Sequence, residues 1–260
     1  MSMRAKKRFG QNFLHDRRMI DKIVSAIRPK TSDVVVEIGP GQGAMTQPLL
    51  TAGGVVHAIE IDDDLIYVLQ QTIRDAGFIL HHADALTFDF SQIASRFRLV
   101  GNLPYNISTP LLFHLMKYTA RIVDITVMLQ REVVDRIVAE PNSKIYGRLS
   151  VMLQYYCAVD RLFLIPPGVF DPVPKVESAL LRLVPKTSRP LTGEEEILLE
   201  ACVKLAFAQR RKTIKNNLKG LLQENDWLNL PIDPQSRAEN LSVQNFISLT
   251  QYLTQNRMIQ

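Results

Sequence analysis

The sequence predicts a doubly wound α/β domain followed by a smaller α-helical domain. Three observations lead to this fold class. Strand-length apolar runs alternate with helical patterns through the first half of the chain. The first of these runs, residues 34–38, breaks into a glycine-rich turn. After a boundary near residues 185–190, only helical patterns remain.

The turn after the first strand has the spacing G-x-G-x-G, at Gly39, Gly41 and Gly43. Glycine allows the backbone to approach a ligand closely, because no Cβ intervenes and positive φ is accessible. The spacing differs from the G-x-G-x-x-G of dinucleotide-binding proteins, so the turn does not predict a pyrophosphate site. A short helix is expected next, over 44–52. A glycine turn without a ligand is the alternative for this segment taken alone.

The next two predicted strands end in acidic residues. The second strand, 55–61, contains Glu60, and the third, 78–83, is followed by Asp84. An acid at the end of the second strand is placed to bind the hydroxyls of a ribose. Asp62–Asp64, by contrast, are typical of the N-cap and first turn of the following helix. Because neighbouring parallel strands end at one sheet edge, the glycine turn and these acids predict a nucleoside pocket.

The fourth predicted strand, 97–101, runs into Asn102-Leu103-Pro104-Tyr105. An exocyclic adenine amine is a weak nucleophile, so its lone pair must be turned toward a methyl donor. The Asn102 side-chain oxygen and the Leu103 carbonyl can each accept one N–H of such an amine. Pro104 fixes φ and keeps Leu103 out of the helical region. Tyr105 offers a flat face for an unstacked base. An ordinary turn is the alternative for the tetrapeptide in isolation.

We place the domain boundary between residues 187 and 188. Two β-rich segments, 162–170 and 178–184, precede it and are expected to close the sheet of the first domain. After it, Thr192-Gly193-Glu194-Glu195 forms a capping box that opens a helix reaching about Gln209. Further helices are expected over about 212–222 and 242–255, which makes the second domain, 188–260, a small helical bundle.

Four motifs stand out along the chain: KRFGQNFL at 7–14, the glycine loop at 37–43, NLPY at 102–105 and FDPVPKVES at 170–178. On these motifs, the chain resembles the KsgA family of small-subunit ribosomal RNA adenine dimethyltransferases, which use S-adenosylmethionine. The resemblance covers nearly the whole chain. The glycine loop is shared by many methyltransferases, whereas the other three motifs are specific as a set. The resemblance implies a Rossmann-like methyltransferase domain, 1–187, and an RNA-binding helical domain.

The resemblance also implies roles for individual residues. Glu60 is expected to bind the ribose hydroxyls of the donor and Asp84 its adenine amine. Phe170 is expected to stack on the target base opposite Tyr105. The expected donor contacts are Gln11, Asn12, Leu14, Gly39, Gly41, Glu60, Ile61, Asp84, Ala85 and Asn102. Neither a metal nor a dedicated general base is expected, because the neutral amine attacks and loses its proton afterwards.

The implied reaction places two methyl groups on N6 of each of two adjacent adenosines. These adenosines lie in the loop of the 3′-terminal hairpin of 16S-type RNA. The expected partner is the small ribosomal subunit or its assembly precursor, and we expect a cytoplasmic monomer. Loss of the activity in the family is associated with kasugamycin resistance. Three alternatives remain: a large-subunit RNA adenine methyltransferase, an N6-adenine DNA methyltransferase and a non-enzymatic RNA-binding assembly factor.

The net charge of +5 is unevenly distributed along the chain. Residues 1–30 carry nine Lys and Arg against two Asp, and residues 199–220 carry six against one Glu. We expect both basic islands to contact RNA phosphates, although solvated helix faces are the alternative for either one. Arg211, Lys215 and Lys219 are expected on one helix face at i, i+4 and i+8. The candidates are Lys6, Lys7, Arg8, Arg210, Arg211, Lys212, Lys215 and Lys219.

Composition argues against several other classes of protein. With 260 residues and 46% hydrophobic side chains, the chain can bury one large core and a smaller one. Cys157 and Cys202 are far apart and outside any Pro-Cys loop, which predicts a reducing compartment and no cysteine nucleophile. His81 and His82 alternate faces on a strand and predict no metal site. The apolar runs predict no membrane span, and the basic N-terminus leads into 9–14 without room for a leader.

Overall fold

The computed structural model describes residue 6 and residues 10–52 and 54–257. Lys7 and Arg8 of the N-terminal island lie outside the described residues. The chain packs as two compact units. The first consists of Met1–Val134 and Asp160–Pro185, and the second of Asp135–Val159 and Lys186–Gln260.

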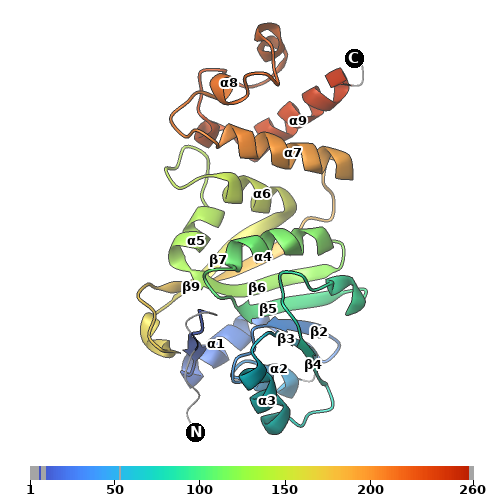
Figure 1. Ribbon diagram of the computed structural model, residues 1–260, viewed down its shortest axis with the longest axis vertical. Helices are drawn as coiled ribbons and strands as arrows, with labels where there is room; N and C mark the ends of the chain where they lie inside the picture. The colour runs from blue at the N-terminus through green and yellow to red at the C-terminus, as the bar shows by residue number, and fades with distance from the viewer. Residues whose placement is uncertain (1–5, 7–9, 53, 258–260) are drawn as a thin grey trace. The chain divides into compact units, whose positions relative to one another are not determined.

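The first unit is built on a seven-stranded sheet with the strand order β4-β3-β2-β5-β6-β9-β7 (Figure 1). Strands β4 to β6 of this order pair in parallel, and β9 runs antiparallel to β6. The chain winds outward from β2 to β4 and then returns to β5 on the other side, which confirms the predicted doubly wound α/β fold. The strands are β2 Val34–Ile38, β3 Val55–Glu60, β4 Phe78–His82, β5 Phe97–Asn102, β6 Ile122–Gln130, β7 Cys157–Ile165 and β9 Ser178–Pro185.

Helices α1 to α3 pack their apolar sides into one core cluster with the sheet. In α1, Ile20, Ile23 and Ile27 recur at helical spacing and are buried. Asp16 caps its first turn, where its side chain accepts from the amide of Met19 at 2.7 Å. The helices are α1 Arg17–Ile27, α2 Thr46–Thr51, α3 Asp63–Thr72, α4 Ser108–Leu115 and α5 Arg131–Ile137, with 3₁₀ turns at Phe90–Gln92, Met116–Tyr118 and Pro167–Val169.

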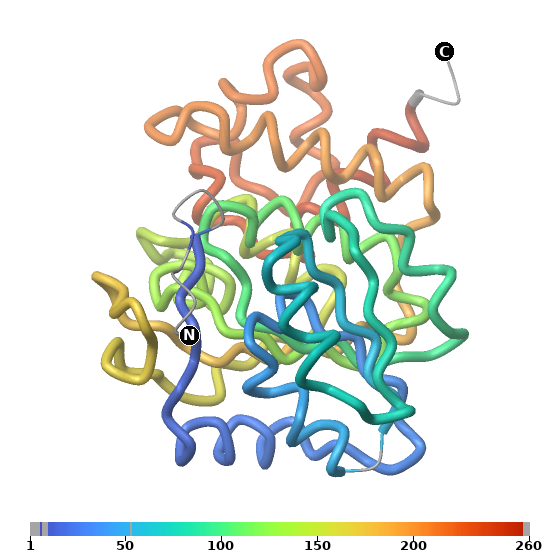
Figure 2. The backbone as a smooth tube through the Cα atoms, turned by 60° about the horizontal axis from the view of Figure 1, so that its bottom comes forward, coloured from blue at the N-terminus to red at the C-terminus, as the bar shows by residue number. Residues whose placement is uncertain are grey.

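A small two-stranded sheet joins the two ends of the first unit's sequence. Strand β1, Phe13–Leu14, pairs antiparallel with β8, Phe170–Asp171. Figure 2 shows the blue N-terminal segment beside the yellow segment that contains β8. This pairing brings the last two residues of the motif at 7–14 against the first two of the motif at 170–178.

The second unit is helical, with α6 Arg148–Tyr156, α7 Gly193–Ala206, α8 Ile214–Asn217 and α9 Val243–Arg257. Two 3₁₀ turns, Glu224–Asn229 and Ala238–Asn240, connect α8 to α9. The capping box predicted for α7 is present, because the Thr192 side chain accepts from the Glu195 amide and the Glu195 side chain accepts from the Thr192 amide. Helix α6 packs against α7 and α9, so residues 135–159 belong with this unit. The sequence grouped them with the first domain.

The helix predicted over 212–222 is wrong. Helix α8 covers only Ile214–Asn217, and Gly220 follows it with φ of +95°. The side-chain amide of Asn217 donates to the carbonyls of Ala206 and Gln209, which anchors the segment as a turn. Arg211 therefore precedes the helix and Lys219 follows it, so these residues and Lys215 do not share one helix face.

Across residues 10–52 and 54–257, no helix is both long and apolar enough to cross a membrane.

Candidate active site

All residues proposed from the sequence as donor contacts line a single cavity in the first unit. They are Gln11, Asn12, Leu14, Gly39, Gly41, Glu60, Ile61, Asp84, Ala85 and Asn102, and Leu103, Pro104 and Tyr105 line the same cavity. The cavity lies where β2, β3, β4 and β5 end, at the point where the winding of the sheet reverses. The topology therefore brings segments that are distant in sequence to one sheet edge.

Two glycines allow the backbone to form this edge. Gly39 has φ of +66°, which favours glycine, and its amide donates to the carbonyl of Ile59 at 3.0 Å. Gly101 lies in β5 beside β2, and a Cβ at this position would be 2.6 Å from the carbonyl oxygen of Ile38. A side chain at either position would disturb the turn or separate the strands that frame the cavity.

The carboxylate of Glu60 is held at the end of β3 by two backbone amides. Its Oε1 accepts from the amides of Ile61 and Asp62, each at 2.9 Å. Burial raises the pKa of Glu60, while these amide hydrogen bonds act in the opposite direction. Backbone amides thus fix the Glu60 side chain in a position that lines the cavity.

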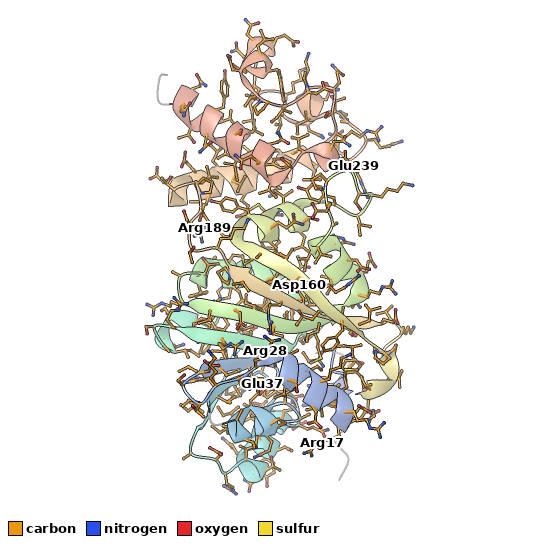
Figure 3. The ribbon with its side chains drawn as sticks, turned by 180° about the vertical axis from the view of Figure 1, so that it is seen from behind. Arg17, Arg28, Glu37, Asp160, Arg189 and Glu239 are labelled. Atoms are coloured by element: carbon orange, nitrogen blue, oxygen red, sulfur yellow. The ribbon has the colours of Figure 1, made fainter. Side chains whose placement is uncertain are left out.

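Glu37 is a site residue to which the sequence analysis assigned no role. It lies within β2, in the sheet of the first unit, and is 1% exposed (Figure 3). Its Oε2 accepts from the Thr46 hydroxyl at 2.6 Å, whereas its buried Oε1 has no partner among the described residues. Burial raises the pKa of Glu37 to about 7, with a further contribution from the nearby Glu60. The sequence feature that could have indicated this role is the acidic residue within an otherwise apolar strand.

Asp62 does more than cap a helix. It caps α3 as expected, accepting from the Asp64 amide at 3.1 Å. It also accepts from Lys6 Nζ at 2.5 Å and from Gln11 Nε2 at 2.8 Å. Burial acts to raise the pKa of Asp62, but the hydrogen bonds from Lys6 and Gln11 outweigh it and lower that pKa. Asp62 therefore ties the N-terminal segment to the end of β3.

Lys6 was expected to contact RNA phosphates, but its charge is already engaged. Its Nζ forms ion pairs with Asp62 and Asp64, each at 2.5 Å. Its backbone amide donates to the Gln11 side chain at 2.8 Å. In this structure, Lys6 is tied to the two carboxylates at the start of α3.

Asp84 sits in a tight turn after β4. Its Oδ1 accepts from the Leu86 amide at 2.9 Å, and its carbonyl accepts from the amides of Thr87 and Phe88. The turn holds the acid at the cavity wall, on the same edge as Glu60.

The side chain of Asn102 is oriented by the N-terminal segment. Its Nδ2 donates to the backbone carbonyl of Asn12 at 2.9 Å. This contact leaves Oδ1 as the acceptor that the amide presents. The next residue, Leu103, donates its amide to the Met128 carbonyl at 3.2 Å, which fixes the backbone after β5.

Tyr105 is partly exposed and is held at both ends. Its hydroxyl lies 3.0 Å from the hydroxyl of Ser178, and its carbonyl accepts from the Ser108 hydroxyl at 3.2 Å. The turn before α4 is closed by the Ile107 amide, which donates to the Pro104 carbonyl. The loop is therefore an ordered wall of the cavity.

Phe170 is not placed where the sequence expectation puts it. It is 1% exposed and packs in the core cluster with Leu14 and Ile20. It does not line the cavity. For Phe170 to stack on a base opposite Tyr105, its ring would have to leave this core.

The basic residues of the second island fall into two groups. Arg210 pairs with Glu239 at 3.1 Å, and Lys215 pairs with Glu224 at 2.7 Å. Arg211, Lys212 and Lys219 are exposed and form no ion pair with any described residue. These three cations are therefore available to an external anion.

Metal-ligating side chains do not gather in the described part of the chain, where no three His, Cys, Asp or Glu residues are arranged to hold an ion. Cys157 and Cys202 are both buried.

Comparison with known proteins gives consistent results. A family model described as ribosomal RNA adenine dimethylase matches residues 2–255. The ribosomal RNA small subunit methyltransferase A of Methylobacillus flagellatus is 53% identical over 249 residues, which cover 96% of this chain and 98% of that protein.

Two solved structures share the fold. A dimethyladenosine transferase from Plasmodium falciparum has a TM-score of 0.80 at 26% identity, covering 94% of this chain and 98% of its own. The 23S rRNA methyltransferase ErmE has a TM-score of 0.71 at 24% identity, covering 94% and 100%, and this likeness shows the fold alone. By the family match over nearly its whole length and by the identity to its relatives, the chain belongs to the ribosomal RNA adenine dimethylase family.

Proposed function

We propose that the protein dimethylates N6 of two adjacent adenosines in the loop of the 3′-terminal hairpin of 16S rRNA, with S-adenosylmethionine as methyl donor. One observation carries the proposal: a nucleoside-binding wall and an amine-orienting loop line the same cavity. Membership of the adenine dimethylase family supports the reaction. The name of the Methylobacillus relative, a small subunit methyltransferase, supports the choice of RNA.

The residues of the cavity suit this donor. The glycine turn offers backbone at close range, Glu60 offers a carboxylate for ribose hydroxyls, and Asp84 lies where an adenine amine would be bound. The unpartnered Oε1 of Glu37 is a further buried acceptor for a hydrogen-bond donor of the bound molecule. When bound, S-adenosylmethionine would supply an electrophilic methyl group on a sulfonium, and the neutral thioether of S-adenosylhomocysteine would be the leaving group.

The loop after β5 orients the target amine. Asn102 Oδ1 and the Leu103 carbonyl accept its two N–H groups, and this turns the nitrogen lone pair toward the methyl group. Pro104 restricts Leu103 to extended backbone, and the hydrogen bond from the Leu103 amide to Met128 holds that carbonyl in place. Tyr105 offers its ring face to the unstacked base. Positioning supplies the rate enhancement, and the proton leaves after attack.

The second unit supplies charge for the RNA backbone. Arg211, Lys212 and Lys219 have no acidic partners among the described residues and are the candidates for phosphate contacts. We infer that the partner is the small ribosomal subunit or its assembly precursor rather than the isolated hairpin, because a short loop would engage few of these charges. The protein acts as a monomer, in the compartment where ribosomes are assembled, the cytoplasm.

The test uses small subunits from cells that lack this activity. The purified protein is incubated with them and with methyl-labelled donor, and methylated adenines are mapped on the RNA. We expect four methyl groups on two adjacent adenosines of the 3′-terminal hairpin, and no label with Asn102→Ala. Label in large-subunit RNA would overturn the choice of substrate. Binding of subunits without any methylation would instead support an assembly factor.

A further inference from the structure

Ser178 lies beside the active-site loop because of the direction of one strand. It is the first residue of β9 and is paired with Gln130, the last residue of β6. Since β9 is antiparallel to β6, it begins at the edge where the parallel strands end. A residue 73 positions after Tyr105 thereby reaches the loop that follows β5.

The position of the Ser178 hydroxyl is fixed. The side chain is 1% exposed, so its hydroxyl requires a protein partner, and that partner is Tyr105 at 3.0 Å. The residue before it, Glu177, is anchored twice to Arg131. The Arg131 amide donates to the Glu177 carbonyl at 2.9 Å, and the Arg131 guanidinium pairs with the Glu177 carboxylate at 2.7 Å.

An anchored hydroxyl restrains the ring of Tyr105. A tyrosine side chain rotates about two torsions, and a partly exposed one samples several of their combinations. With its hydroxyl held by Ser178 and its carbonyl held by Ser108, the ring keeps one orientation before any RNA arrives. A surface that is ordered in advance does not lose this freedom when a base is bound.

We propose that Ser178 is a positioning residue for methyl transfer, which fixes the Tyr105 ring as the surface on which the target adenine rests. The inference rests on the proposed role of Tyr105 in holding the target base. It assigns a task to the last residue of the motif at 170–178. Ser178 does not line the cavity, so its contribution appears in the rate of methylation and not in donor affinity.

The test is a double-mutant cycle with Ser178→Ala, Tyr105→Phe and the combined variant. The rate constant is measured in single turnover, at saturating donor and with small subunits as substrate. We expect each single variant to lower it by about 3- to 10-fold, the effect of one lost neutral hydrogen bond. The combined variant should match either single one, because both substitutions remove the same interaction. Donor affinity by calorimetry should be unchanged.

Two further variants separate this inference from the proposed function. Tyr105→Ala tests the platform itself, and a wild-type rate in that variant would reject the role of Tyr105. A slow Tyr105→Ala with wild-type rates in both Ser178→Ala and Tyr105→Phe would reject Ser178 alone, as would additive effects in the combined variant. Ser150→Ala is the matched control, since it removes an equally buried serine hydroxyl from the second unit and should leave the rate unchanged.

If Ser178→Ala fails to fold, Tyr105→Phe alone decides the inference, because it removes only the hydroxyl of a partly exposed side chain. A rate within the error of wild type in that variant overturns the proposal.

Discussion

The backbone carbonyl of Asn12 accepts a hydrogen bond of 2.9 Å from the side-chain nitrogen of Asn102, 90 positions further along the chain. An asparagine amide has one donor end and one acceptor end. The contact with the N-terminal segment therefore orients the Asn102 amide so that it presents its oxygen. That oxygen can accept a hydrogen bond from an amino group. The motif at 7–14 thus orients a side chain of the motif at 102–105.

This contact predicts the behaviour of Asn102→Asp. The new carboxylate would place an oxygen against the Asn12 carbonyl, where Asn102 now donates, and the two acceptors would repel. We expect the single-turnover rate at saturating donor to fall by about 100-fold or more, at least as far as in Asn102→Ala. Binding of small subunits should fall much less. An aspartate variant that methylates within a few-fold of wild type would refute the orientation argument.

Glu60→Ala should weaken S-adenosylmethionine binding. It removes a carboxylate that offers charge-assisted hydrogen bonds to ribose hydroxyls, so we expect a loss of about 1.5–3 kcal/mol, or roughly 10- to 150-fold in Kd. Calorimetry on the folded variant measures this loss directly. Glu194→Ala, which removes an exposed carboxylate of α7, is the control and should bind the donor like wild type. Equal affinities in the two variants would exclude Glu60 as the ribose ligand.

In the donor-free protein, we expect the stability difference between wild type and Glu37→Gln to depend on pH. Burial raises the pKa of Glu37 to about 7, so the folded state holds its proton more tightly than the unfolded state. The stability due to the protonated form is complete below about pH 4.5 and is lost as pH rises through about 7. Glu37→Gln keeps an acceptor for Thr46 and cannot ionise.

The free energy of unfolding of Glu37→Gln, relative to wild type, should therefore increase between pH 5 and pH 8, by up to about 3 kcal/mol. Denaturant titrations of both proteins at the two pH values measure this change. A difference that stays constant with pH would mean that Glu37 does not titrate in this range.

The unpaired cations of the second unit should set the salt dependence of subunit binding. Replacing Arg211, Lys212 and Lys219 together by alanine should weaken binding and flatten the plot of log affinity against log salt, by up to about one unit of slope per lost phosphate contact. The matched control is the double variant of Arg210 and Lys215, whose charges are paired with Glu239 and Glu224.

The double variant should change the slope less than the triple one, and donor affinity should stay intact in both. An equal change of slope in the two variants would show that ion pairing within the unit does not decide which cations meet RNA.

The parts of the fold that the sequence predicted are those with strong local patterns. The strands β2, β3 and β5 are largely buried parallel strands, which read as mostly apolar runs. The two-residue strands β1 and β8 are too short for any period to appear. The helix predicted over 212–222 is wrong because α8 ends at Asn217, whose side chain bonds the carbonyls of Ala206 and Gln209, and Gly220 adopts positive φ.

The site divides in the same way. Residues of three of the four motifs line one cavity, whereas contacts between distant side chains could not be predicted from residue spacing. Asp62 appeared only as a helix cap, since its partner Lys6 is 56 positions away. The burial of Phe170 likewise follows from the pairing of β1 with β8, which no sequence pattern predicts.

The pairing of β6 with β9 has one more consequence. Their ladder runs from Ile125–Leu183 to Gln130–Ser178. A slip of β9 by one residue would move Ala179 to the position opposite Gln130 and turn every side chain of the strand to the other face. The hydrogen bond between Tyr105 and Ser178 therefore depends on the register of the whole β6–β9 ladder and not on Ser178 alone. An insertion in the loop before β9 can leave this hydrogen bond intact, whereas one extra residue within β9 would shift the register and break it.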